Sequence, residues 1–349
     1  MTPPPTPEAQ LAFLSKIQRL FAEGDFTATY KFALLISLAD LAVERGRDDG
    51  APLALTMPSI SAKFIELYWQ QTAPYSSAHA AATPGVLAQN VGKQAAAVSA
   101  IVQFRQLHPG ATVQSARSHP GYDRLLRDVA RTVADQPVRY LQNLGGTTEP
   151  FLYVRARDAI LLQPGVAYCL RRFQPLVQQL ARSHWIGHLK RNQRNIKLLG
   201  QADDLESFLF EASRQALSIV SAGLRKLVGG NCFYCGSRVA EADVDHFVPF
   251  SQYPRDLVHN FVLAHPACNR SKSDMLAARK HLERWLAQIA DHDDDLQEIG
   301  ADAGLPADRG TCHAVARWSY SNAASSGARA WVRPREFEAV DGAYMERFA

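Results

Sequence analysis

Two short Cys/His motifs constrain the fold of this 349-residue chain more than any other feature. Residues 232–235 read CFYC and are followed by Gly236, and residues 265–268 read HPAC. Three thiolates and one imidazole at this spacing form a tetrahedral ligand set of the kind that structural zinc uses. Four protein ligands leave no open position, so we expect the ion to stabilise the fold and not to activate water. The predicted zinc ligands are Cys232, Cys235, His265 and Cys268.

The segment between the two motifs has the pattern of a β-hairpin. Residues 243–249 read DVDHFVP, and strand alternation places His246 on one face and Asp243 and Asp245 on the other. Residues 260–263 predict the return strand, and residues 267–285 predict a helix that begins next to the last zinc ligand. Because the zinc ion has no open position, the chemistry of the segment must come from side chains of this hairpin and helix other than the zinc ligands.

This order of motifs resembles the HNH, or ββα-metal, endonuclease superfamily. The resemblance covers residues 231–285 and depends on the zinc pairs, the Asp-His dipeptide at residues 245–246, Asn260 and the CNRSK sequence at residues 268–272. It implies a hairpin followed by a helix, which together cut nucleic acid by metal-assisted hydrolysis of phosphodiester bonds.

The resemblance also implies a role for each residue of the site. His246 would be the general base that takes a proton from the attacking water, and Asp245 and Asn269 would hold one Mg²⁺ or Mn²⁺ ion. Asn260 would brace the loop that orients His246. Chemically, an imidazole with an ordinary pKa of about 6.5 suits a base near neutral pH. A hard cation suits the negative charge that develops at phosphorus.

Positive charge is concentrated before the cysteine segment. Residues 159–202 contain no Asp or Glu, although they include Arg171, Arg172, Arg182, Lys190, Arg191, Arg194 and Lys197. A phosphate backbone is attracted to such a local excess, and a solvated helix face is the alternative interpretation. We expect Lys190, Arg191 and Arg194 to contact nucleic acid. DNA is the expected substrate, and RNA remains an alternative. Lys272 and Arg270 are expected to project from the predicted nuclease helix towards phosphate.

The part of the chain before the cysteines is predicted to be mostly helical. Thr6-Pro7 is an N-cap signal for a helix that Gly24 ends, and residues 29–45 are apolar on most sides, as in the centre of a bundle. Further helices are predicted near residues 60–70, 93–107, 122–134 and 203–227, and short strands at residues 151–154 and 160–162.

These patterns predict an α+β protein with four parts. They are a helical domain (1–150), a basic helical linking region (151–230), the HNH nuclease module (231–285) and a short, helical C-terminal extension (286–349) with an acidic loop at residues 291–295. Aromatic residues of the extension, such as Trp331, are expected to pack a small core. No apolar stretch approaches the roughly 20 residues of a membrane-spanning helix. Residues 1–7 lack signal-peptide features, so we expect a cytoplasmic protein without a membrane partner.

Two functions of different classes remain open. The first is a metal-dependent DNA endonuclease, and the second is a non-catalytic, zinc-dependent DNA-binding or scaffold module. The large helical part carries no sequence-reading motif, which favours docking of a protein partner or activator, as in an antiphage or restriction-like effector. A one-metal site cuts one strand, so double-strand cleavage requires either a homodimer or two successive encounters, and the sequence decides neither.

Overall fold

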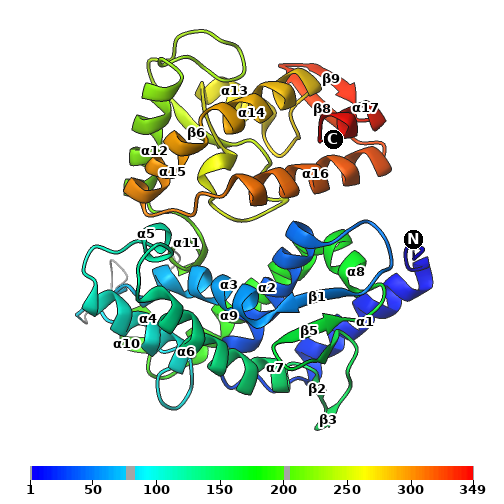
Figure 1. The fold of residues 1–349 in the computed structure, drawn as a ribbon, viewed down its shortest axis with the longest axis vertical. Helices are drawn as coiled ribbons and strands as arrows, with labels where there is room; N and C mark the ends of the chain where they lie inside the picture. The colour runs from blue at the N-terminus through cyan, green and yellow to red at the C-terminus, as the bar shows by residue number, and fades with distance from the viewer. Residues whose placement is uncertain (1, 76–82, 200–204, 349) are drawn as a thin grey trace. The chain divides into compact units, whose positions relative to one another are not determined.

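The computed structural model describes residues 2–75, 83–199 and 205–348. Two compact units form: unit 1 contains Met1–Ala111 and Ala116–Phe210, and unit 2 contains Thr112–Ser115 and Glu211–Ala349. Helices dominate both units, and small antiparallel sheets complete the predicted α+β fold (Figure 1). Within the described ranges, no helix has the length and apolar character needed to cross a membrane.

Unit 1 is a helical bundle that carries a small sheet. Its strands β1 (Leu53–Thr56), β5 (Ala159–Leu162) and β4 (Tyr153–Arg155) pair antiparallel in that order, and β2 (Asn143–Leu144) pairs with β3 (Thr147–Thr148). Its helices are α1 (Pro7–Glu23), α2 (Tyr30–Arg45), α3 (Met57–Trp69), η1 (Gln70–Thr72), α4 (Ala96–Leu107), α6 (Tyr122–Asp135), α7 (Pro137–Tyr140), α8 (Val166–Arg172), α9 (Gln174–Arg191), α10 (Ile196–Leu199) and α11 (Leu205–Phe210). The short helix α5 (Val113–Ala116) lies at a boundary of the two units.

The first two helices form as their sequences predict. Thr6 caps α1 by accepting a hydrogen bond from the Ala9 amide at 3.3 Å, and Gly24 ends the helix. Helix α2 is buried almost without interruption and packs against α3, α8 and α9. The predicted central helix of a bundle is therefore confirmed, because apolar side chains on all sides of α2 find neighbouring helices.

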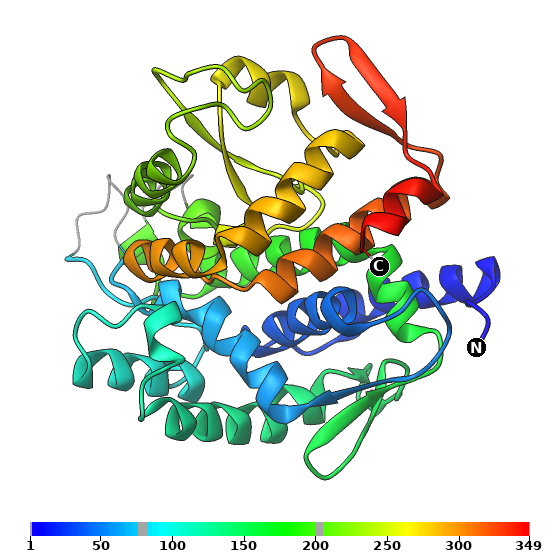
Figure 2. The same ribbon diagram turned by 45° about the horizontal axis from the view of Figure 1, so that its top comes forward.

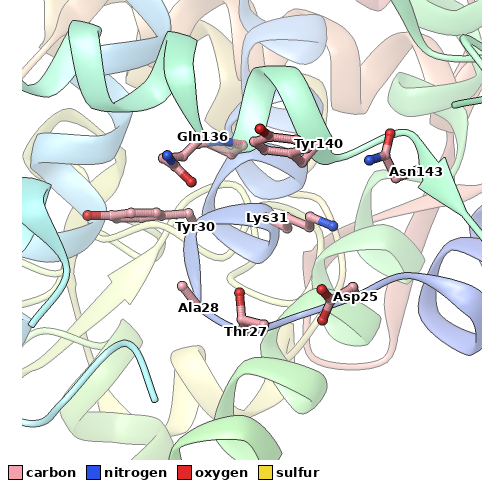
Figure 3. Close-up of a pocket in the computed structure, with 9 residues that line it drawn as sticks. Asp25, Thr27, Ala28, Tyr30, Lys31, Gln136, Tyr140 and Asn143 are labelled. Carbon is pink, nitrogen blue, oxygen red and sulfur yellow. The ribbon is translucent and has the colours of Figure 1, made fainter. Parts of the chain in front are cut away.

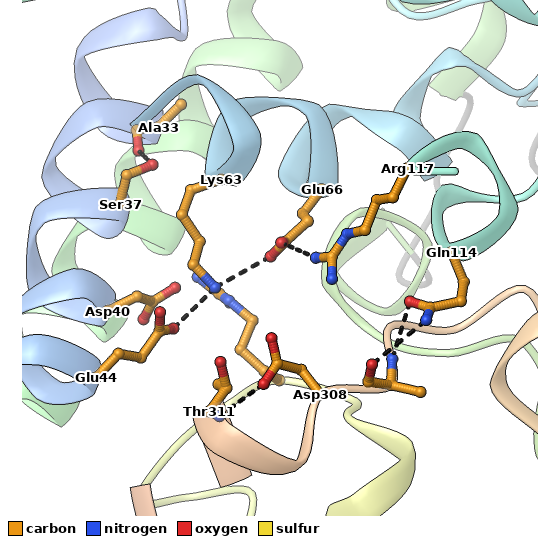
Figure 4. Close-up of polar contacts among 12 residues, drawn as sticks. Ala33, Ser37, Asp40, Glu44, Lys63, Glu66, Gln114, Arg117, Asp308 and Thr311 are labelled. Atoms are coloured by element: carbon orange, nitrogen blue, oxygen red, sulfur yellow. Dashed lines mark hydrogen bonds and ion pairs between the residues drawn. The ribbon is translucent and has the colours of Figure 1, made fainter. Parts of the chain in front are cut away.

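Buried charges in unit 1 are compensated by one another. The Lys63 ammonium lies 2.8 Å from Glu44 and 3.2 Å from Glu66, and Arg117 also pairs with Glu66 (Figure 4). Burial disfavours the charged form of Lys63, but the two glutamates outweigh burial and raise its pKa. Removal of one partner would leave an uncompensated buried charge, so this network links α2 to α3.

The described residues of unit 2 form two separate two-stranded antiparallel sheets. Strands β6 (Asp243–His246) and β7 (Phe261–Ala264) form one, and the hairpin β8 (Arg329–Arg333) and β9 (Glu336–Ala339), red in Figure 2, forms the other. The helices are α12 (Arg214–Leu227), η2 (Val258–Asn260), α13 (Pro266–Lys272), α14 (Arg279–Asp291), α15 (Asp293–Ala303), α16 (Arg309–Ser325), α17 (Gly342–Met345) and η3 (Glu346–Phe348).

Aromatic side chains form the core of unit 2. Phe247 stacks on Trp285 with ring centroids 4.7 Å apart, and both side chains are fully buried. Trp331 and Tyr320 of the C-terminal extension are also buried, and the Tyr320 hydroxyl donates to the Ala277 carbonyl at 2.6 Å. The expectation that aromatics of the extension pack a core is confirmed.

The predicted helix over residues 267–285 is interrupted in the structure. Helix α13 ends at Lys272, and Ser273 takes a positive φ of 49°. The chain then runs beside β8, where the Trp331 amide donates to the Leu276 carbonyl and the Ala278 amide donates to the Trp331 carbonyl, both at 2.8 Å. Backbone pairing with a distant strand replaces the helical hydrogen bonds in this segment.

Two other predicted spans also differ from the structure. Residues 291–295 were expected to be an acidic loop, but they end α14 and begin α15, whose first turn carries three Asp residues. Acidic side chains at a helix N-terminus are stabilised by the helix dipole. The start of the predicted helix 203–227 lies outside the described residues. Its remainder is broken at residues 211–213, where Ser213 caps α12.

Candidate metal centre and catalytic site

The four predicted zinc ligands meet in space. Their ligand atoms all lie within 4.8 Å of one another. The CxxC turn is completed by Gly236, whose φ of 75° is the left-handed conformation that glycine adopts without strain. The second pair lies at the start of α13. This donor set of three sulfurs and one imidazole fits a tetrahedral zinc ion, with the ligands Cys232, Cys235, His265 and Cys268.

His265 is oriented for metal binding through Nδ1. Its Nδ1 atom lies 3.3 Å from the Cys235 sulfur, whereas Nε2 lies 3.2 Å from the Arg238 carbonyl oxygen. A carbonyl can only accept a hydrogen bond, so Nε2 carries the proton and Nδ1 presents its lone pair to the sulfurs. Metal-bound histidines are commonly oriented by such a second hydrogen bond.

The pKa values of Cys235 and Cys268 are shifted in opposite directions. Burial raises the pKa of Cys235, but hydrogen bonds, first from the Ser237 backbone and then from Cys232, outweigh burial and lower it to about 7. Burial, together with the neighbouring Cys232 and Cys235, raises the pKa of Cys268 to about 12. A third thiolate beside two others is disfavoured by their negative charge, and a bound divalent cation would compensate that charge.

His246 lies at the end of β6 with one ring nitrogen bound and one available. Its Nε2 atom lies 2.8 Å from Asp256 Oδ1, and the ring is in edge contact with Phe261, its cross-strand partner in the sheet. Nδ1 makes no hydrogen bond to any residue in the described ranges. The side chain is 22% exposed. A histidine held in this way can accept a proton from a solvent molecule.

Asp256 is a site residue that the sequence analysis did not identify. Its Oδ1 atom contacts His246, and its Oδ2 atom accepts the Ala212 amide at 2.5 Å. The only sequence signal is that Asp256 is the sole acidic residue between His246 and His265. No spacing rule selects it, because nine residues separate it from His246 in the chain.

Asp245 points to the opposite side of the strand and is paired with Lys272. Its Oδ2 atom accepts the Tyr234 hydroxyl at 2.5 Å and lies 3.1 Å from the Lys272 ammonium, which also donates to the His246 carbonyl at 2.8 Å. Lys272 is fully buried. Burial lowers its pKa against the opposing effect of Asp245. Lys272 therefore lies under the hairpin. The expectation from the sequence that it projects from the helix towards phosphate is wrong.

Asn269 and Asp243 also face this side of the hairpin. The Asn269 side-chain amide donates to Asp243 Oδ2 at 3.0 Å. The side-chain oxygens of Asp243, Asp245 and Asn269 are the hard donors that this part of the module offers to a divalent cation.

Asn260 braces the loop after His246. Its side chain accepts the Val248 amide at 2.8 Å and donates to the Val248 carbonyl at 2.9 Å, and its own carbonyl accepts the Phe247 amide at 2.7 Å. Asn260 is buried, so its side chain satisfies two backbone groups that have little access to water. These hydrogen bonds hold the backbone of Phe247 and Val248, directly after His246.

The basic residues divide into structural and exposed groups. Arg171 is buried and donates to Asp48 and to two carbonyls near the end of α2, and Arg182 is buried over the Phe210 ring. These two arginines stabilise unit 1. The predicted nucleic-acid contacts that are exposed are Arg270 in unit 2 and Lys190, Arg191 and Arg194 in unit 1.

Unit 1 also contains a pocket of about 270 Å³ between the start of α2 and α7 (Figure 3). Lys31, Tyr140, Gln136 and Asn143 contribute to its lining. Burial lowers the pKa of Lys31 against the effect of Asp25. Its volume lies just below the range of about 300–1,000 Å³ that is usual for small-molecule sites.

Two family models match the chain. The model described as "Domain of unknown function (DUF8808)" matches residues 10–208, more than half of the sequence, and the model described as "HNH endonuclease" matches residues 232–275. No curated protein and no solved structure matches. The HNH match contains both Cys/His pairs and the hairpin between them, so the HNH module predicted from the sequence is confirmed.

Proposed function

The chain belongs to the DUF8808 family and carries an HNH endonuclease domain, and from this premise we propose that it cuts DNA by divalent-metal-dependent hydrolysis of phosphodiester bonds. The observation that carries the proposal is the placement of His246. It combines partial exposure, an available Nδ1 atom and a fixed ring within an HNH module.

His246 Nδ1 would take one proton from a water molecule as the water oxygen forms its bond to phosphorus. The bond from phosphorus to the leaving oxygen then breaks. A general base at this position is worth about 10²–10⁴ in rate, because hydroxide is scarce near neutral pH. Asn260 supports this step by fixing the backbone directly after the base.

Asp245 and Asn269 would hold the catalytic cation, Mg²⁺ or Mn²⁺, with Asp243 as a neighbouring oxygen donor. A hard divalent cation supplies positive charge that stabilises the phosphorane and the leaving oxygen. An ionised carboxylate offers about four lone-pair positions. The contacts of Asp245 with Tyr234 and Lys272 therefore leave acceptor capacity for a further partner.

One observation favours the alternative, a non-catalytic zinc module that binds DNA. Asp245 is already neutralised by Lys272, as expected for a purely structural ion pair. A binding module would bind DNA equally well with and without an intact His246, whereas an endonuclease would lose cleavage when His246 is replaced.

The test is nicking of supercoiled plasmid by wild-type protein and His246→Ala, with Mg²⁺ or Mn²⁺ and with EDTA. We expect metal-dependent relaxation or linearisation by the wild type and a loss of about a hundredfold or more in the variant. His292→Ala is the matched control, because His292 is an exposed histidine paired with Asp295 and should leave cleavage unchanged. Single-stranded DNA and RNA substrates define the substrate class.

Zinc content and circular dichroism establish that the variants are folded. Equal cleavage by wild type and His246→Ala would remove His246 from the reaction. Absence of cleavage of all these nucleic acids by folded, zinc-loaded wild type, together with retained DNA binding, would support the binding module and refute the endonuclease.

A further inference from the structure

We propose that Asp256 is the positioning residue of His246, and that the Ala212 amide at the start of unit 2 fixes Asp256 in turn. This inference builds on the proposed function, because it assigns His246 as the base. Two hydrogen bonds in series carry it: His246 Nε2 to Asp256 Oδ1 at 2.8 Å, and the Ala212 amide to Asp256 Oδ2 at 2.5 Å.

The first hydrogen bond selects the tautomer of His246. An ionised carboxylate only accepts hydrogen bonds, so the imidazole proton must reside on Nε2. The lone pair then lies on Nδ1, the nitrogen without a hydrogen bond to the described residues. The opposite tautomer would place a proton on Nδ1 and would prevent it from accepting one from water.

The second hydrogen bond fixes the carboxylate itself. Asp256 lies in the loop between the two strands, and its side chain is only 11% exposed. With Oδ2 bound to the Ala212 amide, the carboxylate group cannot rotate away from His246 without losing a charge-assisted hydrogen bond. Phe261 and Phe250 contact the imidazole at centroid distances of 4.8 and 5.2 Å and restrict the ring plane.

Asp256 also stabilises the product of proton transfer. When His246 becomes an imidazolium, the neighbouring carboxylate provides an ion pair at 2.8 Å. Asp245 cannot do this, because its carboxylate contacts Lys272 and Tyr234 on the other side of the strand. This division of roles is the one that the aspartate and histidine of a Ser-His-Asp triad have.

Ala212 connects this arrangement to the domain junction. Unit 1 ends at Phe210, and Ala212 is the residue before Ser213, the N-cap of α12. Helix α12 packs against both strands of the hairpin. The backbone that leaves the DUF8808 domain therefore supplies the amide that holds the aspartate beside the base, so a change in the backbone of residues 211–213 would alter the position of Asp256.

Asp256→Asn tests the tautomer directly. Asparagine has one acceptor oxygen for two donors, the Ala212 amide and His246 Nε2. If the oxygen keeps the backbone amide, the side-chain NH₂ faces His246 and forces its proton onto Nδ1. We expect ¹⁵N NMR of histidine-labelled protein, with His246 assigned from His246→Ala, to show the Nε2–H tautomer in wild type and the Nδ1–H tautomer in the variant.

Cleavage kinetics test the consequence. We expect kcat to fall by about a hundredfold in Asp256→Asn, with little change in KM, and Asp256→Glu to restore part of the loss. Asp293→Asn is the matched control. Asp293 accepts from His259 at the same 2.8 Å, but His259 is fully buried, so this variant should keep its kcat.

The hydrogen bond from the Ala212 amide, which anchors Asp256, is tested without altering the side chain of His246 or Asp256. Ala212→Pro removes the amide hydrogen and should lower kcat by about tenfold, whereas Ala212→Gly retains the hydrogen and should not. This comparison keeps the inference falsifiable if Asp256→Asn fails to fold.

An unchanged tautomer and an unchanged kcat in folded Asp256→Asn would overturn the positioning role. Equal kcat values for Ala212→Pro and Ala212→Gly would overturn the anchor. A tautomer that switches in Asp256→Asn, in a protein whose wild type cuts no nucleic acid, would refute the endonuclease and leave the structural inference standing.

Discussion

Replacement of Lys272 by Met distinguishes two roles for this lysine. As the buried partner of Asp245 it should stabilise the fold, whereas as a phosphate contact it should strengthen DNA binding. In the structure the ammonium is fully buried and contacts Asp245 at 3.1 Å and the His246 carbonyl at 2.8 Å. Loss of one partner from a buried ion pair costs about 3–5 kcal/mol, because the remaining charge stays desolvated. Asp245 keeps its hydrogen bond from Tyr234, so we expect a value near the lower end, about 3 kcal/mol.

Hydrogen exchange of peptides from β6, β7 and α13 measures this change locally. A loss of about 3 kcal/mol corresponds to exchange that is about a hundredfold faster in amides that open with the module. The additional change Asp245→Asn should reduce the destabilisation, because it removes the uncompensated charge. Lys280→Met, at an exposed lysine of α14, should leave exchange unchanged.

The alternative is that Lys272 contacts phosphate, as the sequence suggested. In that case Lys272→Met would leave exchange protection intact, weaken DNA binding and reduce the salt dependence of binding by about one charge. Intact exchange protection would refute the ion-pair argument, because that argument predicts a loss of stability when the buried partner of Asp245 is removed.

Three further predictions concern stability. Cys268→Ser should abolish zinc binding and the exchange protection of the module, because a structural zinc site contributes folding free energy, and retained zinc by mass spectrometry would contradict this. Asn260→Ala should destabilise unit 2 by about 2–4 kcal/mol, since both Val248 backbone groups lose their partner, and an unchanged thermal midpoint would exclude the brace. Burial lowers the pKa values of His259 and His281 below the value of about 6.5 in the unfolded chain. The unfolded protein therefore binds more protons than the folded protein below that pH. The urea concentration at the midpoint of unfolding should decrease as the pH is lowered from about 7 to 5, and a midpoint that does not change with pH would contradict this expectation.

Local patterns were sufficient for the zinc ligands and the hairpin. A CxxC or HxxC pair brings its two ligands together within one turn, and an alternating strand defines which side chains share a face. For this reason Cys232, Cys268 and the face of Asp245 could be predicted without knowledge of the rest of the fold. The capped helix α1 and the apolar helix α2 were predictable for the same reason.

Long-range pairing decided the end of the nuclease helix. Residues 267–285 have a helical pattern, yet Ser273 and the residues after it leave the helix because Trp331 offers backbone hydrogen bonds to Leu276 and Ala278. The partner lies more than fifty residues away in sequence. A short stretch of sequence that is tested for helical periodicity does not include Trp331. It therefore cannot reveal that these backbone hydrogen bonds replace the helical ones.

The sequence by itself determined which groups can bind a metal ion or take part in chemistry in this protein: a set of four Cys and His ligands, a histidine beside an aspartate, and an HNH order of motifs. Only the tertiary structure decided what each group contacts. It buried Lys272 against Asp245, and it placed Asp256 between His246 and the Ala212 amide. The physical reason is that ligand identity follows from covalent spacing, whereas hydrogen-bond partners and burial depend on packing between segments that are distant in the chain.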